Sequence, residues 1–365
     1  MTRRERTIAR SVVFAMLSAG EDGRAAREPS LARALRVFYL HWVALQPARA
    51  DLFAELRRGW GISEAAYRGS FDARKQGRRG AAGAAALLPL GDMGYSGSTF
   101  YRTSDGAYLV KSVPRAFEHR FFRHRLLAAY ADHVRANGAS LLVRITDFLE
   151  AAHRSLGTLL GLAPTHHIVM ENLMHGREGE GEGEGGGSAP RWESWDLKPA
   201  SYFFPERDVA GGALASEATK SKLPDEFRDK LRVSAAQAAA FARQLENDTR
   251  LLADCGAVDY SLFLVRVSAA SAPGDEEAPP PPPLAPPSPP SWRTGIVSRD
   301  GREVYRAAIL DFFWSKHAVH AKAMTGLVRS YDVVAGHGPM TITADSSEYR
   351  DRFLKMCSDI VEVRS

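Results

Sequence analysis

Apolar and polar positions along the chain change their period several times, and each change predicts a different element. Residues 2–50 are rich in Arg and Ala and carry apolar residues at helical spacing, which predicts one or two helices. The apolar face continues from Phe53 to Trp60, and Gly61 stands where that helix is expected to end. The N-terminal part of the chain is therefore expected to be helical.

Around residue 100 the apolar and polar residues begin to alternate, with a period of two residues. Thr99, Tyr101 and Thr103 lie on one side of the Ser104-Asp105-Gly106 turn, and Tyr108-Leu109-Val110 follows it. Alternation on both sides of a Gly-containing turn predicts a β-hairpin.

Beyond the hairpin, long helices alternate with short apolar strands. The pattern predicts helices over residues 115–136, 233–252 and 347–361, and strands near residues 141–148, 167–173, 260–267 and 304–310. No internal repeat is visible, so these elements are expected to build one mixed arrangement of helices and strands.

Composition sets the class of protein. The 365 residues are 45% hydrophobic and 25% charged, which is close to the globular average and excludes wholesale disorder. The longest apolar runs, at residues 12–17 and 84–90, are too short to cross a bilayer. Cys255 and Cys357 form no disulfide framework and no secretory signal is recognisable, so the chain is expected to be intracellular.

Charge indicates the kind of partner. The whole chain is +5, but a Glu-Gly tract at residues 176–188 and a proline-rich tract at residues 272–291 each carry −3, so the remainder is +11. Both tracts lack apolar content and are expected to be solvated insertions. A body this basic favours nucleotide phosphates or an anionic membrane leaflet. No nucleic-acid-binding motif is present, so no nucleic-acid partner is expected.

A glycine-rich segment precedes the hairpin. Residues 94–99 read Gly-Tyr-Ser-Gly-Ser-Thr, and Lys111 ends the second strand. Glycines let backbone N–H groups approach a phosphate, and a nearby Lys reaches the same anion. The alternative is an ordinary turn. Glu118 on the next helix completes the kinase order of glycine loop, Lys and Glu, or is one acid on a basic solvated face.

Segments spread over the chain, in one order, are similar to the signatures of the phosphatidylinositol phosphate kinase family. The resemblance covers about residues 50–356, and its segments are F-A-E-L-R-R-G-W-G-I-S-E-A-A-Y-R-G-S (53–70), the glycine loop (94–101), Lys111, Tyr130-x-x-His133, S-L-L-x-R (140–144), V-M-E-N-L (169–173), W-D-L-K (195–198), V-D-Y-S-L (258–262), I-L-D-F (309–312) and S-E-Y-x-x-R-F (347–353).

The resemblance implies an α+β fold with two lobes and the active site between them. An N-lobe with an antiparallel sheet is expected at about residues 51–175, and a C-lobe with a smaller sheet at about residues 190–356. Residues 1–50 are expected to be a helical extension outside this kinase domain.

The resemblance also implies ATP and Mg²⁺ as cofactors. Lys111 is expected on the ATP phosphates, Asp259 as the base or hydroxyl-orienting carboxylate, and Asp311 on Mg²⁺. The remaining ATP contacts are expected from the glycine loop and the hinge: Gly94, Ser96, Gly97, Ser98, Thr99, Glu171 and Leu173.

The implied substrate is a phosphatidylinositol monophosphate in an anionic membrane, with phosphatidylinositol 4-phosphate converted to the 4,5-bisphosphate. Lys198, Arg207, Lys316 and Lys322 are expected on lipid phosphates, with Trp314 and Met324 inserting at the interface. The expected location is peripheral, on the cytoplasmic face of membranes and of the plasma membrane in particular. The proline tract offers a generic SH3-type ligand.

Departures from the family pattern leave alternatives open. Pro199-Ala200 follows Lys198 where the family has Gly-Ser, and the segment after Asp311 lacks the family's usual lysine pattern. Headgroup choice is therefore open, and a catalytically weak or inactive membrane-binding scaffold is a rival interpretation. A protein kinase is a second rival, against which the missing H-R-D-x-x-x-x-N motif argues.

Overall fold

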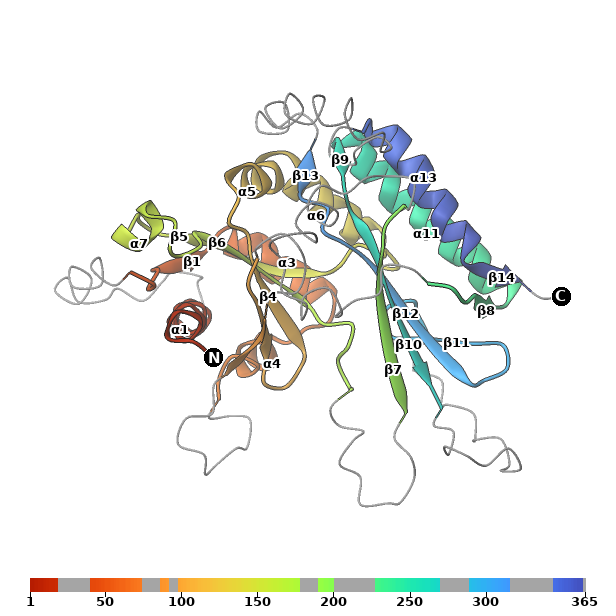
Figure 1. Ribbon diagram of the computed structural model, residues 1–365, viewed down its shortest axis with the longest axis horizontal. Coiled ribbons are helices and arrows are strands. Elements are labelled where there is room, and N and C mark those ends of the chain that lie inside the picture. The colour runs from red at the N-terminus through yellow and green to blue at the C-terminus, as the bar shows by residue number, and fades with distance from the viewer. Residues whose placement is uncertain are drawn as a thin grey trace, which may run out of the picture. The chain divides into compact units, whose positions relative to one another are not determined.

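The computed structural model describes residues 1–18, 40–73, 86–91, 98–177, 190–199, 227–269, 289–315 and 344–363 (Figure 1). Two compact units divide the chain: Met1–His119 with Arg144–His175, and Arg120–Val143 with Gly176–Ser365. Helices and antiparallel sheets occur in the described parts of the chain, which confirms the α+β class.

The first unit is built on a six-stranded antiparallel sheet. Its strands lie in the order β1-β5-β6-β4-β3-β2, and their bounds are Leu45–Pro47 (β1), Ile145–Ala151 (β5), His166–Glu171 (β6), Tyr108–Ser112 (β4), Phe100–Thr103 (β3) and Leu87–Gly91 (β2). The short α7 (Leu156–Leu159) lies in the connection between β5 and β6.

The predicted β-hairpin is confirmed as β3 and β4, with Phe100 opposite Lys111. Gly106 has φ 76°, a conformation that glycine adopts without strain. The Asp105 carboxylate accepts hydrogen bonds from the Thr103 hydroxyl and the Ala107 amide and so closes the turn.

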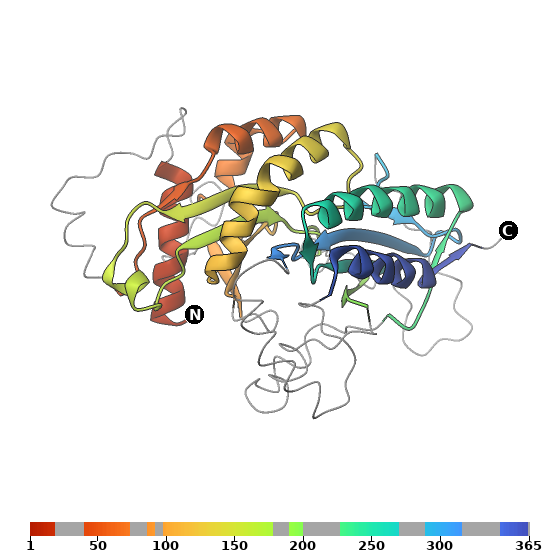
Figure 2. The same cartoon turned by 90° about the horizontal axis from the view of Figure 1, so that it is seen from above.

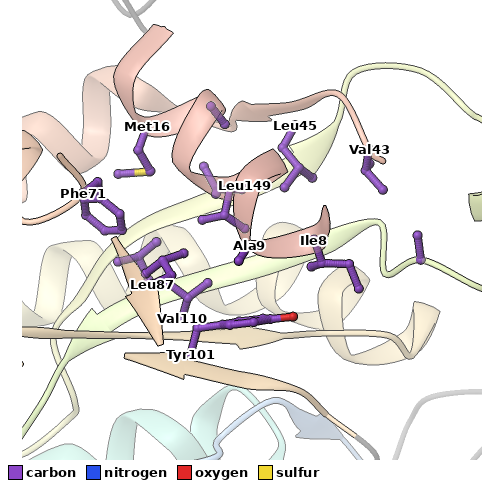
Figure 3. Close-up of a cluster of buried hydrophobic side chains, with 14 of the residues drawn as sticks. Ile8, Ala9, Met16, Val43, Leu45, Phe71, Leu87, Tyr101, Val110 and Leu149 are labelled. Atoms are coloured by element: carbon purple, nitrogen blue, oxygen red, sulfur yellow. The ribbon is translucent and has the colours of Figure 1, made fainter. Parts of the chain in front are cut away.

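Helix α1 (Arg3–Ser18) packs its apolar face into the core of the first unit (Figure 3). The cluster joins Ile8, Val12 and Met16 of this helix to side chains of the sheet, among them Leu45, Tyr101, Val110 and Leu149. The predicted helix is thus present, and it belongs to the same compact unit as the sheet. The helical expectation for residues 40–47 was wrong, because Leu45–Pro47 pairs with β5 as an edge strand.

Helices α3 (Ala50–Gly59) and α4 (Glu64–Gly69) are fastened to β5 by Arg57. Its guanidinium donates to Glu64 at 2.6 Å and to the Thr146 carbonyl at 2.6 Å, and it lies 4.4 Å from the centre of the Tyr67 ring. Gly61 has φ 72° and ends the first helix as predicted. Arg57, Gly61 and Tyr67 of the 53–70 segment therefore serve one buried arrangement: the helix ends just before Gly61, and the chain returns so that the Tyr67 ring packs on the Arg57 guanidinium.

The second unit contains a four-stranded antiparallel sheet in the order β11-β12-β10-β7. Its strands are Ile296–Val297 (β11), Glu303–Leu310 (β12), Ser261–Ser268 (β10) and Arg191–Leu197 (β7). The predicted strands at residues 260–267 and 304–310 are thereby confirmed. Figures 1 and 2 show α11 (Ala235–Asp254) and α13 (Ser346–Asp359) side by side along this sheet.

Three smaller pieces complete the second unit. The two-stranded pairs are β9 (Ala257–Val258) with β13 (Trp314–Ser315), and β8 (Leu231–Val233) with β14 (Val361–Val363). The helix predicted over residues 115–136 runs as α5 (Ala116–Phe121), a π-helical turn (Phe122–Leu126) and α6 (Leu127–Ala136). Most of it falls in the second compact unit, although the sequence placed it with residues 51–175.

Both low-complexity tracts fall almost entirely outside the described residues, so their expected character stays a prediction. Among the described helices, none combines the length and the apolar character that a bilayer crossing requires.

Candidate active site

Strand register in the second unit brings three chemically important residues to one end of the sheet. Leu262 of β10 lies opposite Leu197 of β7, and Ser261 lies opposite Leu310 of β12. Lys198 comes directly after β7, Asp311 directly after β12, and Asp259 two residues before β10. The predicted catalytic carboxylates and this lysine therefore share one edge.

Lys198 and Asp259 form an ion pair at this edge. The ammonium Nζ lies 3.2 Å from Asp259 Oδ1, and both side chains are 20% exposed. Burial alone would lower the pKa of Lys198. The carboxylates of Asp259, Asp196 and Asp311 outweigh that effect, so this pKa is raised and the lysine stays charged. Among the described residues, this end of the sheet therefore brings the Lys198 ammonium close to three carboxylates.

Asp259 and Asp311 both adopt the left-handed backbone conformation, with φ 67° and φ 61°. This region is unfavourable for residues with a Cβ, although Asp tolerates it better than most. Residues that the surrounding structure keeps in an unfavourable backbone conformation are concentrated at functional sites. The two predicted catalytic aspartates have two of the three positive φ values among the described non-glycine residues.

Aromatic packing fixes the turn at Asp259. The next residue, Tyr260, is fully buried, and its ring centre lies 4.7 Å from that of Tyr349 and 4.9 Å from that of Phe353. The Tyr349 hydroxyl donates to the Tyr260 carbonyl. The D-Y-S-L segment and the C-terminal S-E-Y-x-x-R-F segment therefore form one packed unit.

A second aromatic group fixes the turn at Asp311. Phe312 stacks on Tyr130 with ring centres 6.0 Å apart, and Phe313 meets Phe122 edge to face at 5.2 Å. Trp314 then pairs with Val258 and is only 8% exposed. The expectation that Trp314 inserts into a membrane was therefore wrong, because its indole is buried in this unit. Met324 lies outside the described residues.

The sequence did not single out Asp248, which is fully buried in α11. Its Oδ1 lies 2.6 Å from His133 Nε2 and accepts from the Ser140 hydroxyl at 2.8 Å, and its Oδ2 accepts from the Leu141 amide at 2.5 Å. Since a buried carboxylate requires such partners, the Y-x-x-H and S-L-L-x-R segments converge on it. The available signal was an Asp on the apolar stripe of the helix, in line with Phe241, Leu245 and Leu252.

The segment that donates hydrogen bonds to Asp248 lies against β12, the strand that ends just before Asp311. The Ile309 amide donates to the Leu141 carbonyl at 2.7 Å, and the Val143 amide donates to the Ile309 carbonyl at 3.1 Å. The Arg293 guanidinium donates to the Ser140 and Leu142 carbonyls. Residues 140–143 thus add a short parallel bridge at the end of β12.

In the first unit, Lys111 lies on β4 with 7% exposure. Its Nζ is 5.4 Å from the centre of the Phe100 ring on the facing strand. The adjacent Ser112 hydroxyl accepts from the Thr99 amide at 2.8 Å. The end of the glycine-rich segment is therefore tied to the residue beside the lysine.

Of the predicted glycine-loop residues, Ser98 and Thr99 are described and Gly94, Ser96 and Gly97 lie outside the described residues. Ser98 is 2% exposed. Glu118, the candidate partner of the lysine, lies 3.3 Å from the Arg115 guanidinium.

The predicted hinge, residues 169–173, is held by hydrogen bonds of two of its side chains. The Glu171 carboxylate accepts from the Arg144 amide at 2.9 Å, so this side chain binds the end of β6 to the residue that precedes β5. The Asn172 side chain donates to the Gly106 carbonyl at 2.7 Å, and Leu173 is buried. A structural role for the Glu171 carboxylate is thus visible, and its predicted ATP contact stays a prediction, as does that of Leu173.

The donor set at the sheet edge fits Mg²⁺ of the kind used in phosphoryl transfer. Such Mg²⁺ is held by one or two carboxylates together with substrate phosphates and water. Asp311 and Asp259 supply hard oxygen ligands, and Lys198 already places a cation against one of them. Within the described ranges no group of three or more potential ligands forms an all-protein metal cage.

The predicted lipid-binding residues separate into two groups. Lys198 is described and forms the ion pair with Asp259. The other three, Arg207, Lys316 and Lys322, lie outside the described residues.

Comparison with known families identifies the family of the chain. The family model described as Phosphatidylinositol-4-phosphate 5-Kinase matches residues 82–281, which is more than half of the chain. The chain therefore belongs to the phosphatidylinositol-4-phosphate 5-kinase family. No curated protein matches it significantly. Family membership makes it a phosphoinositide kinase that uses ATP and acts on a phosphoinositide lipid.

Proposed function

We propose that the chain transfers the γ-phosphate of ATP to the 5-hydroxyl of phosphatidylinositol 4-phosphate, producing the 4,5-bisphosphate. The observation that carries the phosphoryl-transfer step is the meeting of Lys198, Asp259 and Asp311 at one end of the sheet, whereas the choice of substrate and hydroxyl rests on the family alone. Phosphoryl transfer requires positioned cations and a group that orients the attacking hydroxyl, and little covalent chemistry from the protein.

In this proposal Asp259 accepts a hydrogen bond from the attacking inositol hydroxyl and orients its oxygen toward the γ-phosphate. Asp311 holds Mg²⁺, which when bound neutralises charge on the ATP phosphate oxygens. Lys111, from the first unit, contacts the ATP phosphates together with the end of the glycine-rich segment at Ser98 and Thr99. The strained φ values of the two aspartates support their assignment.

Lys198 takes a role in the transfer itself. Its ammonium is charged and lies 3.2 Å from Asp259 Oδ1. An incoming phosphoryl group brings negative charge that competes for the ammonium. We therefore place Lys198 on the transferred phosphate. The phosphate of the lipid headgroup then falls to Arg207, Lys316 and Lys322, which the sequence alone supports.

The lipid substrate requires contact with an anionic membrane. The +11 charge outside the two acidic tracts supports peripheral binding at the cytoplasmic face of membranes, with the plasma membrane favoured. The proline tract adds an SH3-type partner to the proposal.

The test is turnover of separate vesicle populations, each carrying one phosphatidylinositol monophosphate, with Mg²⁺ and labelled ATP. The proposal predicts that the 4-phosphate is the preferred substrate, that the product is the 4,5-bisphosphate, and that Asp311→Asn abolishes the product. Preference for the 5-phosphate would overturn the assigned position. Absence of turnover with retained ATP binding would favour the inactive scaffold, and Pro199→Gly is the first variant to examine for recovered activity.

A further inference from the structure

The connection between β5 and β6 exposes a group of leucines to solvent. Their exposed fractions are 43% for Leu156, 63% for Leu159, 60% for Leu160 and 36% for Leu162. Single exposed leucines are ordinary on a protein surface. Four within seven residues form an apolar patch of the kind that marks an interaction site, and we call these four residues the leucine tip.

The leucine tip is held in place by its own turn. Ser155 and Thr158 form a capping box at the start of α7. Gly157 is buried, and a Cβ at this position would lie 1.8 Å from the Leu40 carbonyl oxygen. The Leu162 amide donates to the Gly157 carbonyl at 2.8 Å. These contacts fix the backbone, so the leucines are presented outward by an anchored turn.

Residues 40–43 connect this turn to helix α1. Leu40 contacts Gly157, and three residues later the Val43 amide donates to the Ser11 hydroxyl of α1 at 3.1 Å. The Trp42 and Phe14 rings meet with centres 5.9 Å apart. Figures 1 and 2 show α1 and the α7 turn at the same end of the first unit.

Basic residues occur beside the leucine tip in the sequence and on helix α1 of the same unit. Residues 151–170 contain no Asp or Glu, and Arg154 is exposed beside Leu156. The outer face of α1 exposes four further arginines, and Glu5 is the one acid in that helix: Arg3, Arg4, Arg6 and Arg10. An apolar tip accompanied by basic residues is the combination that binds an anionic lipid surface.

We propose that the leucine tip inserts into an anionic membrane leaflet while the α1 arginines contact the lipid headgroups. A bilayer accepts convex apolar side chains without a preformed pocket, whereas a protein partner would have to supply a complementary groove. The proposal rests on the proposed function only in that the substrate is a membrane lipid. It adds a membrane-binding surface on the first unit whose residues take no part in the proposed phosphoryl transfer.

The test uses the full chain and vesicles of phosphatidylcholine with phosphatidylserine, without phosphoinositide and without ATP. The double variant Leu159→Ser/Leu160→Ser is expected to lower vesicle affinity at least about tenfold, because it removes the apolar contribution. Val363→Ser is the matched control, since Val363 is 49% exposed in the other unit. Arg4→Gln/Arg6→Gln is expected to weaken the dependence on phosphatidylserine.

A fluorescence measurement reports insertion directly. An environment-sensitive dye on Leu160→Cys, in a Cys255→Ser background, is expected to shift to the blue on vesicle addition and to be quenched by nitroxides in the acyl region. Unchanged emission and unchanged affinity of the serine variant would overturn the proposal. So would a concentration-dependent dimer that the serine variant loses, because a second copy would then occupy the leucine tip. Insertion without any lipid turnover would contradict the proposed function alone.

Discussion

The ammonium of Lys198 lies 3.2 Å from the carboxylate of Asp259, where the ends of β7 and β10 meet. The contact joins two family segments that are 61 positions apart in the sequence. It places Lys198 beside the proposed catalytic aspartate, and the neighbouring carboxylates explain why the pKa of this lysine is raised.

Replacing Lys198 with Met should lower kcat by at least about a hundredfold, because a positive charge is removed from the transferred phosphate. The measurement is the initial rate of lipid phosphorylation at saturating ATP. Lys355→Met is the control, since that ammonium is on the surface of α13 with its side chain 75% exposed. A Lys198→Met protein that keeps kcat but raises the KM for the lipid would instead restore the headgroup role.

Asp311 permits a test of the strained backbone. Asp311→Gly and Asp311→Ala both remove the carboxylate, and they differ in how they tolerate φ 61°. The Gly variant is therefore expected to be more stable than the Ala variant by about 1 kcal/mol in urea unfolding. Both should be inactive. Equal stability of the two variants would contradict the assigned backbone conformation.

Asp248→Ala is expected to cost about 3 kcal/mol of stability, because it leaves His133, Ser140 and the Leu141 amide without their buried acceptor. Chemical denaturation measures the loss. Asp254→Ala, at the exposed end of the same helix, should change stability by less than about 0.5 kcal/mol. Similar behaviour of the two variants would show that the buried network contributes little.

His167 should make the fold sensitive to acid. It is fully buried in β6, and burial lowers its pKa from 6.5 to about 4. Between these values the unfolded chain binds a proton that the folded chain does not, so stability falls as the pH drops. From pH 6.5 to pH 4.5 this contribution amounts to about 2 kcal/mol.

The measurement compares urea unfolding of the wild type and His167→Leu at those two pH values. The variant should lose about 2 kcal/mol less than the wild type over the interval. His124→Leu removes an exposed imidazole and should follow the wild type. If His167→Leu also follows the wild type, the imidazole is protonated in the folded state without cost.

The elements with a clear period were predictable from the sequence. The β3–β4 hairpin and helices α11 and α13 follow from alternation, from a turn glycine and from apolar spacing. The edge strand β1 was not predictable, since three residues ending in Pro47 have no period of their own. It exists because β5 offers a pairing partner 104 positions away.

The site was predictable in part. Motif resemblance selected Asp259 and Asp311, whose places at strand ends the structure bears out. Their meeting with Lys198 depends on sheet register, which no single segment specifies. The burial of Trp314 was missed for the same reason, because its cover comes from the pairing with Val258. Residues 92–97, which include the first half of the glycine loop, lie outside the described residues.

The most direct test of the account is the rate at which Asp259→Asn transfers phosphate from ATP to phosphatidylinositol 4-phosphate in vesicles. The substitution keeps the size of the side chain and removes the charge that pairs with Lys198 and that we propose orients the attacking hydroxyl. The account predicts a rate at least about a hundredfold below the wild type, with Asp254→Asn unchanged. A rate within about twofold of the wild type would contradict the assignment of this sheet edge as the centre of phosphoryl transfer.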